Sequence, residues 1–431
     1  MDSTNGVSRH VDESLVADFR THLPDLSQPR FTTAKKQTPY DYTEAFQKNH
    51  QPPWLYDLTQ AWQELLKEPY KGVTNDGTIR TGLYQDEDVG ASTAKIIEAT
   101  NTFLGKLSYE QTKKVRYPMA AKEWRCWSNP EFLLRPLGLR LEELPEDVTQ
   151  SILGILEVTF SPEGYQKALV AMRINHFMGE CCDVVNIMNK YSYNFLLYGE
   201  PSSEKAWGWS MYGHHLCLNV FLKAGNIYVT PTFTGAEPNQ IDQGPWAGTQ
   251  ILHKEGELGL QLMQSLPKET QEQVQIYKLM RDPKMLQSGD LKIDRWNQDD
   301  QRHVCGAFRD NRVVPYEGIK VSSMTLEQQQ LILGIAEEFL LYHPHQARQA
   351  RKELIQKHFD ETYFSWIGGY GDDDAFYYRI QSPVIVFEFD HHSGVFLTNK
   401  EPMKFHTHTL VRMPNAGDYG QALRDPQDRV P

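Results

Sequence analysis

Hydrophobic residues recur at the spacing of one helix face along much of the chain. Helices are expected over residues 54–67, 92–107, 145–180 in two pieces, 255–282 and 325–341, with a further one ending near 358. The break within 145–180 falls at Ser161 and Pro162, because serine caps a helix and proline suits its first turn. Thr325 and Gln328 have the spacing of a capping box that opens a helix.

Aromatic and β-branched segments separated by turn residues predict strands. The expected strands cover residues 193–198, 214–222, 227–233, 377–380, 384–390 and 405–412. Residues 1–45 show no sustained period and are interpreted as a polar arm. We find no linker and no internal repeat in the remainder. The sequence therefore predicts one α+β domain over 46–431, with an antiparallel or mixed sheet surrounded by helices.

Composition narrows the classes of partner. The 431 residues carry 44 Lys plus Arg against 56 Asp plus Glu, a net charge of −12, so a nucleic-acid partner is not expected. No window reaches the roughly 18 uninterrupted apolar residues of a membrane span. The polar N-terminus lacks a signal-peptide pattern, so we expect a cytoplasmic protein. The sequence makes no prediction of oligomeric state.

Histidines in the predicted strands suggest a metal site. His406 and His408 alternate along one strand, so both point the same way, about 7 Å apart, and can reach one ion. In the strand from 214, alternation places His215 on the polar face and His214 on the apolar face. Glu388 is a carboxylate within an otherwise apolar strand and requires compensation. We predict His215, His406 and His408 as metal ligands, with Glu388 as a fourth ligand or an orienting residue.

These ligands leave the metal and the reaction open. Sets of histidine with carboxylate commonly hold iron, whereas three histidines suit zinc or copper. We expect one transition-metal ion, with iron or copper favoured and zinc or manganese as alternatives. Iron or copper would support a metal-dependent oxidoreductase that uses molecular oxygen on a small organic molecule. Zinc would instead support hydrolysis, and a non-catalytic small-molecule-binding protein with hydrogen-bonded histidines is the third alternative.

Substrate contacts are expected from cationic and aromatic side chains near the predicted ligands. Arg412 and Arg379 would clamp a carboxylate. His214, Trp209 and Trp366 would line an organic pocket, although the tryptophans equally suit a core. The pair 391–392 is followed by Ser-Gly, so these two histidines are predicted to lie in an exposed turn.

Several motifs resemble one family. Residues 198–202 read YGEPS and residues 207–219 read WGWSMYGHHLCLN, which resembles a signature of the domain-of-unknown-function family numbered 3500. Agreement continues in TPTFTGA (230–236), GPWAG (244–248), WIGG (366–369), YYRI (377–380), EFD (388–390) and HTHTLVR (406–412). The resemblance spans about residue 70 to 420 and implies that the matched residues matter without naming a reaction. The polar arm resembles that of intracellular fungal members, which implies an association with specialised metabolism.

Overall fold

A computed structural model of the chain describes residues 19–285 and 303–431. Predictions that concern residues 1–18 lie outside the described part. The helices are α1 (Pro29–Ala34), α2 (Pro39–Asn49), α3 (Pro53–Leu65), α4 (Thr93–Gly105), α5 (Tyr109–Val115), α6 (Glu146–Thr159), α7 (Pro162–Cys181), α8 (His253–Ser265), α9 (Lys268–Val274), α10 (Leu326–Phe339) and α11 (His345–Lys357). Within the described ranges, no helix has the length and apolar character needed to cross a bilayer.

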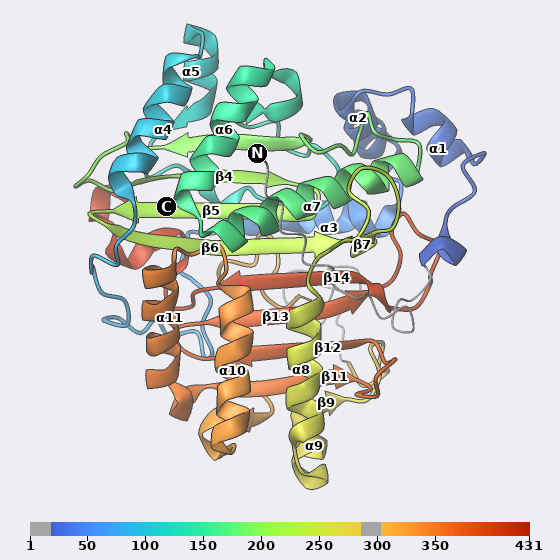
Figure 1. Ribbon diagram of the computed structural model, residues 1–431, viewed down its shortest axis with the longest axis vertical. Coiled ribbons are helices and arrows are strands. Elements are labelled where there is room, and N and C mark those ends of the chain that lie inside the picture. The colour runs from blue at the N-terminus through green and yellow to red at the C-terminus, as the bar shows by residue number, and fades with distance from the viewer. Residues whose placement is uncertain (1–18, 286–302) are drawn as a thin grey trace, which may run out of the picture.

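One sheet of twelve strands organises the described residues (Figure 1). The strands are β1 (Arg116–Tyr117), β2 (Leu139–Arg140), β3 (Tyr193–Tyr198), β4 (Trp207–Gly213), β5 (Leu216–Lys223), β6 (Asn226–Ala236), β9 (Gln275–Tyr277), β10 (Ile319–Lys320), β11 (Tyr363–Gly368), β12 (Phe376–Gln381), β13 (Val386–His392) and β14 (Met403–Arg412); β7 (Gln240–Ile241) and β8 (Thr249–Gln250) pair separately. The main order is β1-β3-β4-β5-β6-β14-β13-β12-β11-β10. This mixed sheet with its helices confirms the predicted α+β class.

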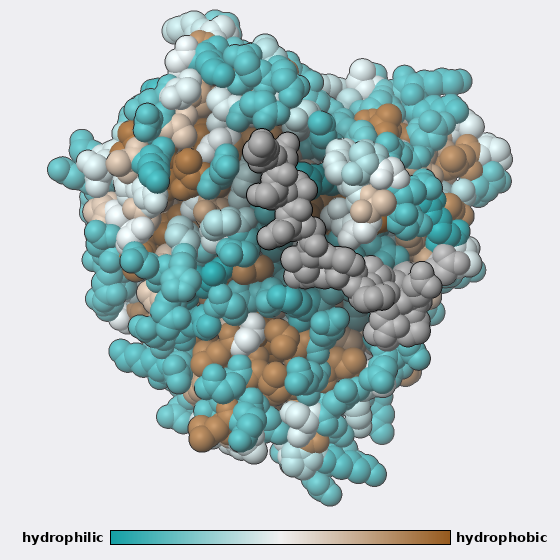
Figure 2. All heavy atoms as spheres, in the orientation of Figure 1, coloured by the Kyte–Doolittle hydropathy of each residue, from teal (hydrophilic) through white to brown (hydrophobic). Residues whose placement is uncertain are grey.

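Both faces of the sheet are covered. Figure 1 shows α4, α6, α7, α8, α10 and α11 over one face. On β13, Phe387 packs against Phe339 of α10, with ring centroids 4.8 Å apart. The alternate residue Glu388 lies on the opposite face, where it contacts the segment 303–317. This double burial explains why the strands are apolar almost throughout. On the outer surface, Figure 2 shows apolar side chains gathered over α8 and α10.

The described part of the predicted arm packs on the body. Phe19 lies against Phe177 of α7, with ring centroids 6.1 Å apart. Thr38 and Asp41 form a reciprocal capping box at the start of α2. Phe31 and Phe46 are buried. Residues 19–45 therefore form short helices fixed by a few aromatic anchors, which a search for sustained periodicity does not detect.

The chain contains an internal repeat, so the prediction of no repeat is wrong. Among the described residues, the order α4-α5-β1-β2-α6-α7-β3-β4-β5-β6 recurs as α8-α9-β9-β10-α10-α11-β11-β12-β13-β14. The pairings recur too: β1 and β9 are parallel to β3 and β11, whereas β2 and β10 are antiparallel to them. The sequence ILGILE at 152–157 corresponds to ILGIAE at 332–337. The last strands of the two repeats, β6 and β14, meet in the middle of the sheet.

Candidate metal centre

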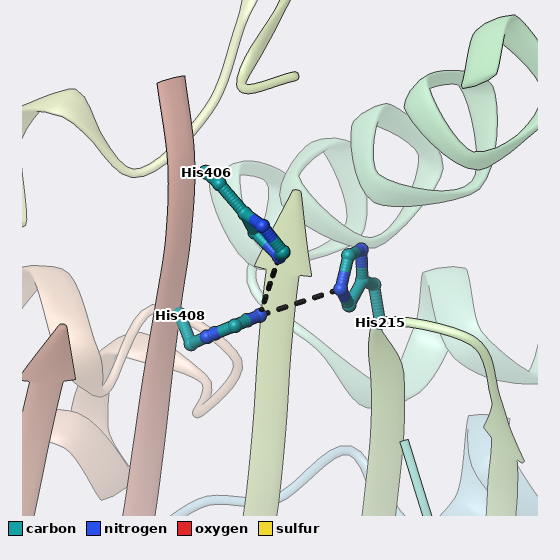
Figure 3. Close-up of side chains that lie close together, drawn as sticks. All are labelled: His215, His406 and His408. Atoms are coloured by element: carbon teal, nitrogen blue, oxygen red, sulfur yellow. Dashed lines mark hydrogen bonds between the residues drawn. The ribbon is translucent and has the colours of Figure 1, made fainter. Parts of the chain in front are cut away.

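Three imidazoles meet on the face of the sheet opposite the layer of α8, α10 and α11. Figure 3 shows His406 and His408, both on β14, converging with His215, which immediately precedes β5. The Nε2 atom of His408 lies 3.0 Å from Nε2 of His406 and 3.3 Å from Nε2 of His215. All three residues are buried, none of them more than 4% exposed. The structure thus brings together the three histidines predicted as ligands; metal binding itself stays a prediction.

Hydrogen bonds behind two of the rings determine their tautomers. Nδ1 of His406 lies 2.8 Å from the carbonyl oxygen of Ser393, and Nδ1 of His408 lies 3.1 Å from the carboxylate of Asp390. Since both partners are acceptors, each Nδ1 carries the ring hydrogen, and each neutral ring presents an Nε2 lone pair to the cluster. Two such lone pairs 3.0 Å apart repel one another unless a cation lies between them.

The spacing of the nitrogens fits a metal ion. Two nitrogens at typical zinc distances in a tetrahedral site are about 3.3 Å apart. The separations of 3.0 and 3.3 Å between the Nε2 atoms are close to that value. Metal-bound histidines usually donate their other ring hydrogen to a carboxylate or a backbone carbonyl, which is the arrangement at His408 and His406.

Burial keeps these imidazoles neutral near pH 7. It lowers the pKa of His406 to about 4. Burial, reinforced by the neighbouring histidines, also holds the pKa values of His215 and His408 well below their ordinary range. The neutral imidazole is the form that binds a metal. The cluster is therefore in a ligand-competent state without any prior loss of protons.

Asp390 is a member of the site that the sequence analysis did not assign. It pairs directly with His408 in the register of β13 and β14 and is fully buried. Its Oδ1 atom also lies 2.9 Å from Nε2 of His303. One carboxylate oxygen therefore links the segment 303–317 to a ring of the cluster. The alternation of β13 could have indicated this role, because Asp390 shares a face with Glu388.

Local backbone geometry makes room for the rings. His215 has φ 60°, in the left-handed region, at the turn between β4 and β5. The rings of His214 and His215 stack with centroids 4.0 Å apart, so the prediction that they occupy opposite faces is wrong: strand alternation does not extend through this turn. Gly235 of β6 faces His408, and a Cβ there would lie 2.6 Å from the His408 ring and 2.8 Å from the His215 ring.

Glu388 lies outside the imidazole cluster. Its carboxylate accepts hydrogen bonds from the backbone amides of Val304 at 2.7 Å and Cys305 at 2.9 Å, and from the Tyr377 hydroxyl at 2.6 Å. The predicted compensation for this buried charge therefore comes from hydrogen-bond donors. Within the described residues, the groups spaced to hold an ion combine His215, His406 and His408, or His303, Asp390 and His408.

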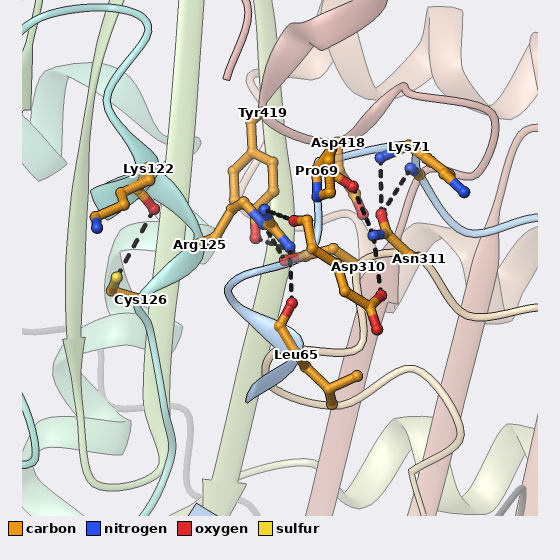
Figure 4. A network of polar contacts seen from close by, with 12 residues as sticks. Leu65, Pro69, Lys71, Lys122, Arg125, Cys126, Asp310, Asn311, Asp418 and Tyr419 are labelled. Atoms are coloured by element: carbon orange, nitrogen blue, oxygen red, sulfur yellow. Dashed lines mark hydrogen bonds and ion pairs between the residues drawn. The ribbon is translucent and has the colours of Figure 1, made fainter. Parts of the chain in front are cut away.

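The two arginines predicted to clamp a substrate are engaged within the protein. Arg412 is fully buried and donates to Asp310 at 2.7 Å and to the carbonyl of Gly306 at 2.7 Å. Arg379 donates to Glu317 at 2.7 Å. Figure 4 shows Asp310 within a wider network. Arg412 and Arg379 thus hold the carboxylates of Asp310 and Glu317 to the sheet. Both arginines therefore stabilise the segment 303–317 on this face.

The remaining predicted contacts divide between core and site. Trp209 packs against Phe160 and Phe195, and Trp366 stacks on Phe376 with centroids 4.3 Å apart. Both tryptophans are fully buried core residues. His214 does lie beside the cluster, with its Nδ1 2.8 Å from the Asn175 side-chain oxygen.

The prediction of an exposed turn at His391 and His392 is wrong. Both residues end β13, and both are buried: β14 pairs with that end of the strand, and His391 faces α8. The His392 ring stacks on that of His406, with centroids 5.1 Å apart. His392 therefore borders the cluster, and the pairing of β13 with β14 was the missing information.

A small cavity adjoins the cluster at His215. Its volume is about 20 Å³, and α3 contributes Trp54, Leu55, Leu58 and Trp62 to its wall. That volume holds about one water-sized molecule. The indole Nε1 of Trp62 is buried and has no hydrogen-bond partner among the described residues. The cavity wall thus combines the apolar side chains of α3 with polar residues, among them Asn129, Glu131 and His215.

The fold and the site together define a duplicated α+β protein with a buried cluster of three imidazoles. The chain belongs to the family described as "Protein of unknown function (DUF3500)", whose model matches residues 89–421. That range begins just before α4 and includes both repeats. Comparison with curated proteins and with solved structures finds no match.

Proposed function

We propose that this protein is a metal-dependent enzyme whose ion is held by His215, His406 and His408. The observation that carries the proposal is the approach of two Nε2 lone pairs to 3.0 Å. Ser393 and Asp390 fix both rings in that orientation from behind. A bound cation would turn the repulsion between the lone pairs into attraction.

The donor set favours copper or zinc over iron. Iron sites of this kind commonly include a carboxylate ligand, whereas Glu388 is engaged by backbone amides. Three imidazoles leave open positions on the ion for a small molecule. The cavity at His215 has the size of water or dioxygen, about 20 Å³. We therefore propose, first, an oxidoreductase that uses copper and molecular oxygen on a small organic molecule.

A zinc-dependent hydrolase is the second proposal. The contact between Asp390 and His408 supports it, because a carboxylate behind a histidine increases the basicity of that ligand and is common at zinc. Zinc would supply a bound water with a pKa near ~7. In either case the cavity at His215, about 20 Å³ in volume and lined in part by α3, is too small for an organic substrate, so its wall must open to admit one. A cytoplasmic location and a role in specialised metabolism are further parts of the proposal.

Elemental analysis and metal titration test the proposal. Protein prepared without a polyhistidine tag should bind one copper or zinc ion per chain, and His408→Ala should bind at least 100-fold more weakly. His176→Ala is the matched control, because His176 lies on α7 beside Glu180, outside the cluster. Equal affinity of wild type and His408→Ala would refute the metal centre. Copper with oxygen uptake supports oxidation, whereas zinc without uptake supports hydrolysis.

A further inference from the structure

A second cavity lies on the other face of β14. Thr407 and Phe405 alternate with His406 and His408, so their side chains face the helix layer. The cavity has a volume of about 130 Å³ and lies between these residues, β12, β13 and α8. It is separated from the imidazole cluster by the sheet itself, and the proposed metal centre does not use it.

The walls of this cavity suit a single ring. Phe376, Phe389 and Phe405 line it, and the Phe376 and Phe389 rings lie 5.6 Å apart. An engineered apolar protein cavity of about 150 Å³ binds benzene, so a cavity of 130 Å³ has the size class of a one-ring molecule.

Two polar atoms in the cavity wall lack partners among the described residues. The hydroxyl of Thr407 is one, and the residue is only 1% exposed. The second is Nε2 of His253, the first residue of α8. A buried polar atom without a partner is costly, so such atoms indicate a ligand that supplies the missing hydrogen bond.

His391 adds a donor to the same wall. Its Nδ1 accepts a hydrogen bond from the backbone amide of Phe376 at 3.1 Å, so the neutral ring carries its hydrogen on Nε2. The charged groups at the cavity, Glu257 and Lys404, have opposite signs. The lining therefore has no net charge from these two residues and suits a neutral ligand. A hydroxyl group, which both donates and accepts, matches this mixture of polar atoms.

We propose that this cavity is a binding site for a small neutral phenol-type compound, one aromatic ring bearing a hydroxyl group. The ring packs between the three phenylalanines, and the hydroxyl bonds with Thr407 and His253. The site is independent of the metal proposal, since its contacts lie on the opposite face of β14 and on α8.

Calorimetric titration with phenol tests the proposal on the full-length protein. Phenol should bind saturably and at least about fivefold more tightly than benzene, the effect of one net hydrogen bond. Thr407→Val, which removes the hydroxyl at similar volume, should weaken phenol binding about fivefold and leave benzene unchanged. Leu260→Trp on α8 should fill the cavity and abolish binding of both probes.

The matched control is Lys254→Ala, an exposed position on α8 outside this cavity, which should bind phenol as the wild type does. Absence of saturable phenol binding to the wild type, or unchanged binding in both Thr407→Val and Leu260→Trp, would overturn the proposal. Leu260 lies on α8, away from the imidazole cluster, so the metal content of this variant should equal that of the wild type. The phenol titration can therefore be interpreted even if the protein proves to bind no metal ion.

Discussion

The orientation of His408 depends on a single buried carboxylate. Asp390 Oδ1 holds the Nδ1 hydrogen of His408 at 3.1 Å. We expect Asp390→Asn to weaken metal binding 10- to 100-fold, because the amide lacks the charge that increases the basicity of the ring. Competition titration against a chelator measures this affinity, with Asp360→Asn in the short helix before β11 as control. Unchanged affinity in Asp390→Asn would remove the carboxylate from the proposed centre.

Gly235 provides a steric test at the same site. A Cβ at this position would lie 2.6 Å from the His408 ring and 2.8 Å from the His215 ring, so both buried rings would have to shift. We expect Gly235→Ala to lower metal affinity at least tenfold at a stability cost of about 1–3 kcal/mol. Gly154→Ala in α6 is the control, because a Cβ there meets nothing within 4 Å. A Gly235→Ala protein that binds metal normally would contradict the close packing of the rings.

Single residues were predictable where one local rule determines their position. The period of two in a strand placed His406 and His408 side by side, and both lie in the cluster. The same rule failed in placing His214 and His215 on opposite faces, because a positive φ at His215 turns the chain. Strand alternation also does not tell which residues of neighbouring strands pair with one another. It therefore selected Glu388 as the acidic residue of the site, although Asp390 is the residue paired with His408.

At the level of elements, β13 anchors the segment 303–317. Glu388 binds two successive backbone amides of that segment, at Val304 and Cys305. We expect Glu388→Gln to destabilise the protein by about 2–3 kcal/mol, because one amide loses its charged acceptor. Hydrogen exchange at Val304 and Cys305 should accelerate, whereas Glu361→Gln at the exposed pair with Arg80 should leave it unchanged. Normal exchange rates in Glu388→Gln would show that other contacts hold the segment.

Long elements were predicted well and short ones were not. The predicted helix over 54–67 corresponds to α3, and the break at Ser161 and Pro162 separates α6 from α7. The expected helix over 255–282 is instead α8, α9 and then the strand β9. Strands of two or three residues such as β1 and β9 have no period of their own. They form because a neighbouring long strand offers unpaired backbone groups.

For the whole molecule, the repeat of the element order α4–β6 as α8–β14 organises the fold, but little of the sequence is shared between the two repeats. Gly138 and Gly318 immediately precede the equivalent strands β2 and β10, both with positive φ and both close to a carbonyl of the following strand. Equivalent positions are 180 residues apart at these glycines and 169 apart at Phe195 and Phe364. A search for a fixed period therefore fails. The site draws on both repeats, because His215 precedes β5 of the first repeat and His406 and His408 lie on β14 of the second.

Protonation couples to the stability of the whole molecule. Burial lowers the pKa values of His214, His343 and His391 to about 3 and that of His406 to about 4. In the unfolded chain such rings take up protons near pH 6.5, so below that pH the unfolded state binds more protons than the folded state. Buried carboxyls oppose this effect, because burial raises the pKa of Glu237 to about 7, that of Asp418 to about 6 and that of Glu131 above its ordinary value.

The histidines are more numerous and most of their pKa values lie further from the ordinary value, so they decide the sign. We expect the metal-free protein to be most stable above about pH 6.5 and to lose a few kcal/mol as the pH falls towards about 4, at ~1.4 kcal/mol per proton and pH unit. Urea unfolding across this range measures the loss. In His343→Gln, an amide oxygen can replace Nε2 as acceptor for the Val229 amide without titrating, so the slope should be shallower. A free energy of unfolding that stays constant or rises on acidification would contradict this prediction. It would mean that the raised carboxyl pKa values dominate, or that the buried imidazoles are protonated in the folded state as readily as in the unfolded chain.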